Sequence, residues 1–258
     1  MEQIRSPLAG WVGGKYLLSK TIVPLIPEHQ CYAEPFSGAA WILFRKTPSA
    51  CEVLNDINGD VVNLYRVVQH HWEAFVEELR WSLSSREEFT RLLDSPTAGM
   101  TNIQRAARFY YVHKLSFGGR MAGRRTFGTS ATGPTSFNPL AIRREAARAH
   151  RRLARVTVEN LPYPDLIRRY DRAGTFFYID PPYWDCENHY GKGIFSKSDF
   201  GALAEQLARL KGKFLLSLND VPEVREIFGA FHIDPVTTRY SCANSKNLPA
   251  QELLIRNY

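Results

Sequence analysis

The stretch CYAEPFSGAAWILFRK, residues 31–46, combines two structural signals within sixteen residues. Its start is typical of a buried strand, and its apolar end is typical of a helix. Between them, the run Phe36–Ala40 is made mainly of small residues, which let a ligand approach the backbone where the helix begins. A strand that turns directly into a helix is the unit from which α/β sheets are built.

The same alternation of strand and helix recurs along the chain. Ala50–Asp56 is predicted to be a strand that ends in an acid, and after residue 150 the runs RVTVEN, TFFYID and KFLLSLND alternate with helical patterns. In the region between these two parts, the apolar residues mostly have helical spacing. The sequence therefore predicts an α/β domain formed by residues 1–60 and 151–258, interrupted by a mostly helical insert of residues 61–150.

The composition favours a cytoplasmic protein with an acidic partner. Lys and Arg number 33 against 26 Asp and Glu, so the net charge is +7. Basic residues gather at Arg120, Arg124 and Arg125 and in the run Ile142–Val156, which suits nucleic acid, although a solvated helix face explains the second run equally well. Scattered cysteines without CxxC, and histidines without HExxH spacing, imply no metal site. The N-terminus lacks a signal-peptide pattern, and no apolar stretch is long enough to span a membrane.

Asp56 ends the second predicted strand, eighteen residues after Gly38. An acid in this position can accept hydrogen bonds from the ribose hydroxyls of a nucleoside cofactor bound at the small-residue turn. The glycine pattern is only a fragment of a dinucleotide-binding fingerprint, so a second interpretation stays open, in which Asp56 caps the next helix. Trp11 and Lys15 add an aromatic ring and a cation that could flank an adenine or a carboxylate.

A second acid, Asp180, ends a hydrophobic run and is followed by Pro181, Pro182 and Tyr183. Ligands of open α/β sheets bind beyond the carboxyl ends of the strands, where Asp180 would lie. The two prolines lack an N–H and have a restricted φ, so nearby carbonyls are held rigidly. A carboxylate, a fixed carbonyl and a flat ring suit a planar base that carries an amino group. The alternative is a rigid turn with a core tyrosine.

Four of these motifs occur in a known order. WVGGK, EPFSGAA, LNDIN and DPPY, at residues 11–15, 34–40, 54–58 and 180–183, resemble the Dam-type (D12 class) adenine-N6 DNA methyltransferases. The resemblance covers nearly the whole chain and is weakest in residues 86–150. It implies a Rossmann-like, S-adenosylmethionine-dependent methyltransferase whose helical insert recognises double-stranded DNA.

The resemblance also implies a role for each motif residue. Contacts with S-adenosylmethionine are expected from Trp11, Lys15, Phe36, Gly38, Asp56 and Asp180. Catalysis is expected from Asp180, Pro181, Pro182 and Tyr183, and phosphate contacts from Arg120, Arg124 and Arg125. The family's turn is written FxGxG, and Ala40 replaces its second glycine here; because alanine is a mild replacement, we expect cofactor binding to survive.

Other substrates fit the motifs less well than adenine in DNA. Cytosine-N4 enzymes more often carry Ser in place of the Asp, so Asp180 favours adenine. RNA adenine-N6 methyltransferases share the DPPY motif, but a helical insert favours duplex DNA, and a non-catalytic DNA-binding relative need not keep the motif. The loop Phe117–Asn138 does not clearly match the GATC-reading form. The target sequence therefore stays open, as does a restriction endonuclease partner.

Overall fold

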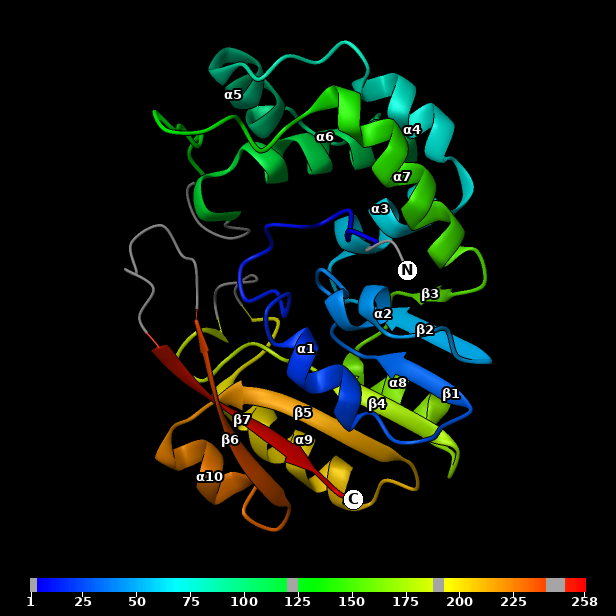
Figure 1. Cartoon of the computed structure of the whole chain (residues 1–258), viewed down its shortest axis with the longest axis vertical. Coiled ribbons are helices and arrows are strands. Elements are labelled where there is room, and N and C mark those ends of the chain that lie inside the picture. The colour runs from blue at the N-terminus through cyan, green and yellow to red at the C-terminus, as the bar shows by residue number, and fades with distance from the viewer. Residues whose placement is uncertain (1–3, 120–124, 188–192, 240–248) are drawn as a thin grey trace.

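A central sheet with helices around it forms the larger part of the molecule (Figure 1). The computed structural model describes residues 4–119, 125–187, 193–239 and 249–258. The strands are β1 (Cys31–Glu34), β2 (Cys51–Asn55), β3 (Thr157–Glu159), β4 (Thr175–Ile179), β5 (Lys213–Asn219), β6 (His232–Arg239) and β7 (Pro249–Arg256). The helices are α1 (Ser19–Ile22), α2 (Trp41–Arg45), α3 (Gly59–His70), α4 (Trp72–Leu79), α5 (Arg86–Asp94), α6 (Asn102–Leu115), α7 (Pro139–Leu153), α8 (Tyr163–Tyr170), α9 (Lys197–Ala208) and α10 (Pro222–Ile227). Short 3₁₀ turns occupy Val23–Leu25 and Phe117–Gly119.

The strands lie in the order β3-β2-β1-β4-β5-β7-β6. Strands β1 to β5 run parallel, and β7 runs antiparallel between β5 and β6. The order of the parallel strands reverses between β1 and β4, which are neighbours although about 140 residues separate them in the chain. At such a reversal the connections leave in opposite directions and open a crevice at the carboxyl ends of the strands. The arrangement confirms the expected Rossmann-like methyltransferase fold.

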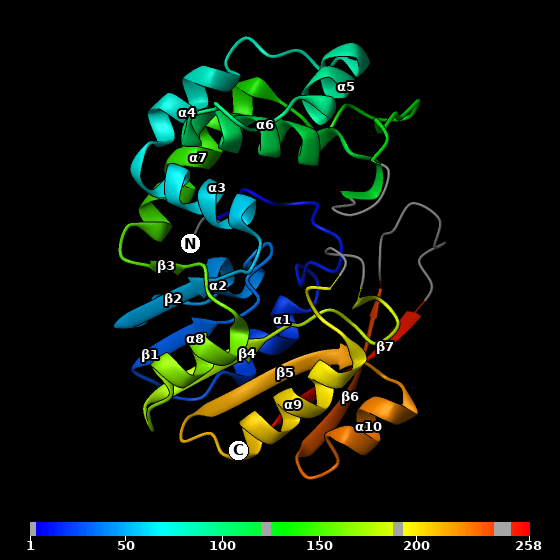
Figure 2. The ribbon, with the colours of Figure 1, turned by 180° about the vertical axis from the view of Figure 1, so that it is seen from behind.

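Helices cover both faces of the sheet (Figure 2). Strand β4 shows why, because all five of its residues are buried. Successive side chains of a strand point to opposite faces: Phe177 and Ile179 join the apolar cluster that includes α8 and α9, whereas Phe176 and Tyr178 join the cluster on the α1 and α2 side. A strand buried on both faces needs a nearly continuous apolar sequence, and TFFYI supplies it.

Helices α3 to α7 form a layer beyond the β3 edge of the sheet (Figure 1), and their buried residues join the apolar cluster on one face of the sheet. Helix α6 lies at its centre, with Phe109, Tyr111 and Leu115 among its buried residues. Local signals define the helix starts: Thr101 and Gln104 form a capping box at α6, and Asn138 accepts the N–H of Leu140 at α7. These helices span residues 59–153, the region where the sequence places the insert.

A buried ion cluster connects this layer to the sheet. Arg152 of α7 pairs with Glu52 of β2, with Nη2 2.8 Å from Oε1, and donates to the carbonyl of Leu43. Lys46 contacts the same carboxylate at 2.6 Å. Because side chains of all three charged residues are at least nine-tenths buried, Arg152 is an internal anchor. The basic run Ile142–Val156 is therefore not a uniform nucleic-acid-binding face.

Candidate active site

The turn after β1 is held by contacts with the ends of the neighbouring elements. Asp56, just beyond β2, accepts the N–H of Gly38 at Oδ2 and the N–H of Asn58 at Oδ1, each at 2.9 Å. The hydroxyl of Tyr65 donates to the carbonyl of Gly38 at 2.7 Å. Gly38 has a φ of 43°, in the left-handed region that favours glycine. The turn is thus a rigid wall formed partly by backbone.

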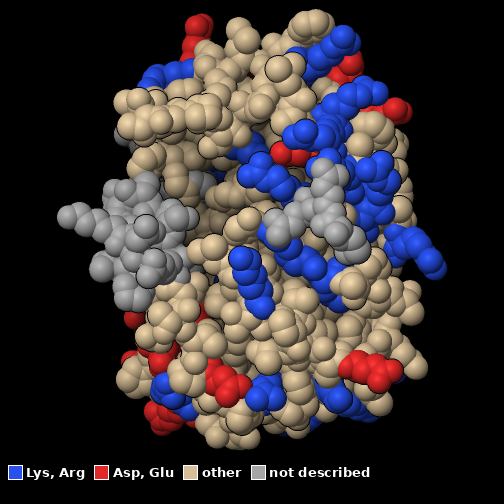
Figure 3. Space-filling view, in the orientation of Figure 1, with Lys and Arg blue, Asp and Glu red and all other residues tan. Residues whose placement is uncertain are grey.

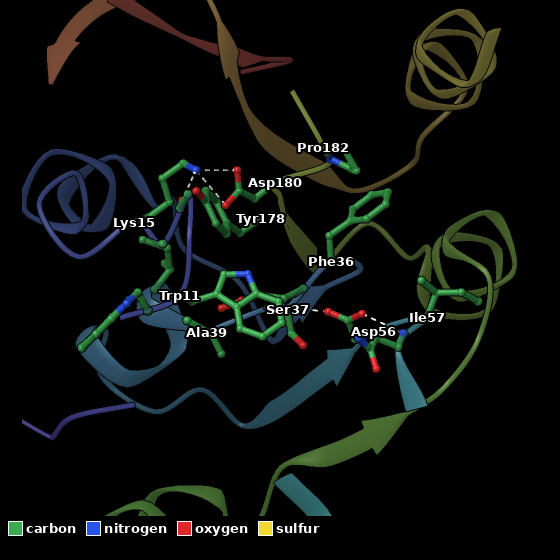
Figure 4. A pocket seen from close by; sticks show the side chains of 18 of the residues that line it. Trp11, Lys15, Phe36, Ser37, Ala39, Asp56, Ile57, Tyr178, Asp180 and Pro182 are labelled. Carbon is green, nitrogen blue, oxygen red and sulfur yellow. Dashed lines mark hydrogen bonds and ion pairs between the residues drawn. The ribbon is translucent and has the colours of Figure 1, made fainter. Parts of the chain in front are cut away.

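The alternative role of Asp56 as a helix cap is not what the structure has. Asn58 caps α3, because its side chain accepts the N–H of Asp60. The carboxylate of Asp56 instead lies against the turn and lines a pocket (Figure 4). Burial raises its pKa to about 6, although the N–H groups of Asn58 and Gly38 oppose the rise. The carboxylate of Asp56 is therefore largely removed from water, and a further hydrogen-bond donor from a ligand would stabilise its ionised form.

The pocket lies at the carboxyl ends of β1, β2 and β4, where the strand order reverses (Figure 4). It brings together residues predicted from four separate motifs. Those that line it are Trp11, Lys15, Phe36, Gly38, Asp56, Asp180 and Pro182. Pro181 and Tyr183 lie next to this lining, on the segment that leaves β4. Ser37, from the predicted small-residue turn, also lines the pocket, as do Glu34 and Tyr178, for which the sequence predicted no role.

The pocket has the features of a nucleoside cofactor site. A Cβ added to Gly38 would come 3.1 Å from Nε1 of Trp11, so the turn approaches the indole as closely as a glycine allows. The buried hydroxyl of Ser37 has no hydrogen-bond partner among the described residues, which leaves it available to a ligand. Carboxylates at Asp56 and Asp180 stand on either side of aromatic walls, among them Phe36. This donor and acceptor set fits S-adenosylmethionine.

Asp180 is held at both carboxylate oxygens. The ammonium of Lys15 lies 2.7 Å from Oδ1 and 2.9 Å from Oδ2, and it also donates to the carbonyl of Gly13 at 2.8 Å. Ser217 of β5 donates to Oδ1 at 3.0 Å. Burial raises the pKa of Asp180, whereas Lys15 and Ser217 favour the ionised form. The carboxylate is therefore both oriented and partly neutralised before any substrate binds.

Tyr183 is held at its hydroxyl and on its ring. The hydroxyl donates to Oε2 of Glu252 at 2.6 Å, and Nζ of Lys15 lies 4.7 Å from the ring centre, a cation–π distance. Sequence reasoning missed Ser217 and Glu252. Their signal was a polar residue inside an otherwise apolar strand, in KFLLSLND and QELLIRNY, but a polar residue on a strand does not reveal its partner.

A second, wider groove adjoins the pocket. Its lining comes from the N-terminal segment around Arg5, from Lys114 of α6 and from the residues before α7, and it shares Trp11 and Lys15 with the pocket. Lys and Arg side chains gather over the middle of the visible face and along the α7 side, whereas much of the acidic surface lies at the opposite end (Figure 3). Arg5, Lys15 and Lys114 in its lining make the groove itself predominantly basic.

Of the three arginines predicted to contact DNA, only Arg125 can be placed. Arg120 and Arg124 lie outside the described residues. Arg125 is half-buried, and burial together with the nearby Arg108 lowers its pKa. In the part of the chain that the structure describes, no three His, Cys, Asp or Glu side chains are grouped to hold a metal. Within the same residues, no helix is long and apolar enough to cross a membrane.

The fold is an α/β sheet with a pocket that fits a nucleoside cofactor, and comparison with known proteins identifies it as a methyltransferase. The family model of the D12 class N6 adenine-specific DNA methyltransferases matches residues 11–242. A Type II methyltransferase of Lactococcus lactis subsp. cremoris, M1.LlaDCHI, is 28% identical over 98% of this chain and 95% of its own length. The DNA adenine methylase of Vibrio cholerae serotype O1 is 25% identical, over 88% of this chain and 86% of its own.

A shorter match points the same way: the DNA adenine methylase of Escherichia coli K12 is 30% identical over 42% of this chain and 40% of its own. Because the family model spans most of the sequence, this chain belongs to the D12 class of N6 adenine-specific DNA methyltransferases. It is an enzyme, its substrate is DNA, and its methyl donor is S-adenosylmethionine.

Proposed function

We propose that the enzyme acts at a specific sequence in duplex DNA, on an adenine that has left the base stack, with Asp180 as the group that binds the reacting amine. The observation that carries this proposal is the position of Asp180. Its carboxylate lies where β4 ends, between the pocket that holds Asp56 and the segment that holds Tyr183, and both oxygens are already oriented (Figure 4). A group at this boundary can face the cofactor and the target base together.

We assign the cofactor contacts to the pocket residues Trp11, Lys15, Phe36, Gly38, Asp56 and Asp180. Asp56 would accept the ribose hydroxyls, and the aromatic walls would flank the flat and apolar parts of the ligand. When bound, S-adenosylmethionine supplies an electrophilic methyl group on its sulfonium. The protein's own contribution is to hold the acceptor amine in line with that methyl and to keep water away.

Adenine N6 is a weak nucleophile because its lone pair is delocalised into the ring. Asp180 and the carbonyl of Pro181 would each accept one N6 hydrogen, which favours a pyramidal nitrogen with a directed lone pair. The ionised carboxylate also stabilises the positive charge that grows on N6 in the transition state. Lys15 and Ser217 favour that ionised form in the free protein. The proton leaves after transfer, so Asp180 need not act as a strong base.

A base inside a duplex cannot reach the pocket, and extruding it costs a few kcal/mol. Stacking on the ring of Tyr183 would offset part of this cost, since such contacts are worth roughly 1–3 kcal/mol per base. Pro182 is buried and has a restricted φ, so it limits movement of the ring that follows it. Lys15 already lies over this ring, so a stacked base uses the face that the ammonium leaves free or displaces it.

The DNA itself would lie in the basic groove, and residues 61–150 would form its target-recognition insert. The groove and the pocket share Trp11 and Lys15 in their linings, so a base extruded from DNA bound in the groove would lie near Asp180. Arg120, Arg124 and Arg125 would contact phosphates, which makes the affinity dependent on salt. The proposal places the enzyme in the cytoplasm, in keeping with its DNA substrate and with free thiols at Cys31, Cys51 and Cys186.

The test is methylation of genomic DNA, read by nucleoside mass spectrometry and by single-molecule sequencing. We expect N6-methyladenine in one short sequence context. Asp180→Ala should lower the rate by roughly 10²- to 10³-fold or more, because it removes the group that stabilises charge in the transition state. Binding of DNA should be largely retained, and Glu205→Ala, an exposed acid of α9, serves as the matched control. An Asp180→Ala enzyme with full activity would refute the mechanism.

A further inference from the structure

Three polar side chains lie on one face of the sheet, beneath the segment that follows β4. Ser217 and Asn219 are two residues apart on β5, and Asn219 is paired directly with Glu252 of β7. Alternate residues of a strand share a face, and so do directly paired residues of neighbouring strands. Ser217 and Glu252 are fully buried and Asn219 is half-buried. The sheet thus presents a short polar row in an otherwise apolar region.

Each member of this row holds a different residue of the segment Asp180–Trp184. Ser217 donates to the carboxylate of Asp180, and Glu252 accepts the hydroxyl of Tyr183. Asn219 contacts the backbone of Trp184 twice, accepting its N–H at 3.0 Å and donating to its carbonyl at 3.2 Å. The segment is therefore fixed at its first, fourth and fifth residues.

Side chains are needed here because the backbone cannot do the same work. Pro181 and Pro182 have no N–H, so this segment cannot extend the β4–β5 ladder with backbone hydrogen bonds. The ladder ends at Ile179, which is paired with Leu216. Beyond that point, the contacts of the polar row take the place of the ladder.

Glu252 is the member of the row whose burial destabilises the fold most. Its side chain is fully buried, Oε2 accepts the hydroxyl of Tyr183, and Oε1 has no hydrogen-bond partner among the described residues. Burial raises the pKa of Glu252, and the nearby charge of Asp180 adds to the rise, while Lys15 opposes it. A buried carboxyl with one unsatisfied oxygen destabilises a fold, and such groups cluster at functional sites. The backbone pairing of β5 with β7 does not depend on this side chain.

We propose that Glu252 is a positioning residue of the methyl-transfer site: it fixes the phenol of Tyr183, and thereby the plane on which the target base stacks. Ser217 and Asn219 complete the cradle by holding Asp180 and Trp184 on either side. The inference rests on the function proposed above, in which Tyr183 stacks on an extruded adenine. It adds that the ring is oriented from beneath, through its hydroxyl.

The test compares Glu252→Leu with Glu252→Gln, which keeps an oxygen that can accept the phenol hydrogen. Removing a hydrogen bond to a charged group should lower kcat by about 10- to 100-fold in the leucine variant. The glutamine variant should recover most of this loss, and the dissociation constant of S-adenosylhomocysteine should stay within twofold in both. Glu226→Leu on the surface of α10 is the matched control.

Two further readouts separate positioning from general destabilisation. DNA with 2-aminopurine at the target adenine should fluoresce more strongly with Glu252→Leu than with the wild type, because stacking on an aromatic ring quenches this base. In a Tyr183→Phe background, Glu252→Leu should cost little more, because the hydroxyl through which Glu252 acts is already gone. Thermal unfolding of each variant confirms that the compared proteins are folded.

The outcomes are distinguishable. Wild-type protein that leaves no N6-methyladenine on DNA refutes the proposed function. An active wild type with an equally active Glu252→Leu, or with the same 2-aminopurine signal, refutes the positioning role alone. A full additional loss from Glu252→Leu in the Tyr183→Phe background would also overturn it, because Glu252 would then act by another route. A glutamine variant as impaired as the leucine variant would show that charge matters and position does not.

Discussion

The proposed contact of Asp56 with the ribose predicts that cofactor binding depends on pH in a defined direction. Burial raises the pKa of its carboxyl to about 6 in the free protein. The ionised carboxylate of Asp56 accepts the hydrogen bonds of both ribose hydroxyls better than the neutral carboxyl does. Binding therefore favours the ionised form and lowers the pKa of Asp56 in the complex. Affinity should therefore be nearly complete at pH 7 and above, and should be lost as the pH falls through 6. Because the pKa of Asp56 is higher in the folded than in the unfolded protein, its neutral form stabilises the free fold. This contribution to stability is lost as the pH rises from the pKa of the unfolded chain towards 6.

The size of the effect follows from the fraction of Asp56 that is ionised. With a pKa of about 6, roughly a tenth of the molecules carry the charge at pH 5 and about nine-tenths at pH 7. The dissociation constant should therefore be about tenfold higher at pH 5 than at pH 7, with a slope close to one decade per pH unit below pH 6. Above pH 7 this group should contribute no further change.

Isothermal titration calorimetry with S-adenosylhomocysteine between pH 5 and pH 8 measures this directly, because the ligand keeps the ribose and does not turn over. Asp56→Asn keeps the shape but cannot ionise, so its affinity should fall about tenfold at pH 7 and the limb near pH 6 should vanish. Glu34, a buried carboxyl on the pocket wall with a pKa of about 8, titrates in both proteins and is cancelled by this comparison. A wild-type dissociation constant that stays flat from pH 5 to pH 8, or a limb that survives in Asp56→Asn, would refute the reasoning.

Two further predictions concern the stability of the fold. Arg152→Met leaves the buried carboxylate of Glu52 with Lys46 as its one remaining charged partner among the described residues. The free energy of unfolding should therefore fall by about 3 kcal/mol and Tm by roughly 6–12 °C, whereas Arg151→Met, on the exposed side of the same helix, should change little. Equal melting temperatures for the two variants in scanning fluorimetry would contradict this. Ala40 has a φ of 49°, in the left-handed region, so Ala40→Gly should leave stability unchanged or raise it by up to about 1 kcal/mol in urea unfolding, and a clear loss would show that the strain is absent.

Much of the architecture could be read from local patterns. The run from Cys31 to Lys46 forms a strand, a turn and a helix as expected. The buried strand TFFYI ends at Ile179, directly before Asp180, also as expected. Asp56 and Asp180 could be assigned to one site because the carboxyl ends of parallel strands meet at the same edge of a sheet. The local pattern alone leaves two roles open for Asp56, and the structure excludes the helix cap because Asn58 occupies the capping position of α3.

The partners of the charged and polar side chains could not be predicted from the sequence. Arg152 belongs to a basic run whose composition suits nucleic acid, yet it lies against Glu52, a hundred residues earlier in the chain. Nothing in the spacing of either residue reveals that pairing. The contact depends on how α7 packs against β2, which is set by the shape of the whole helical layer.

The sequence by itself determined the alternation of strands and helices, the acids at the strand ends and the glycine turn, because each of these features depends on residues that are close together in the chain. Only the tertiary structure decided that Lys15 joins Asp180, and that Glu252 holds Tyr183. Those contacts follow from the reversal of strand order beside β4 and from the antiparallel register of β7 on β5. Register and strand order result from packing over the whole sheet, so no local stretch of sequence encodes them alone.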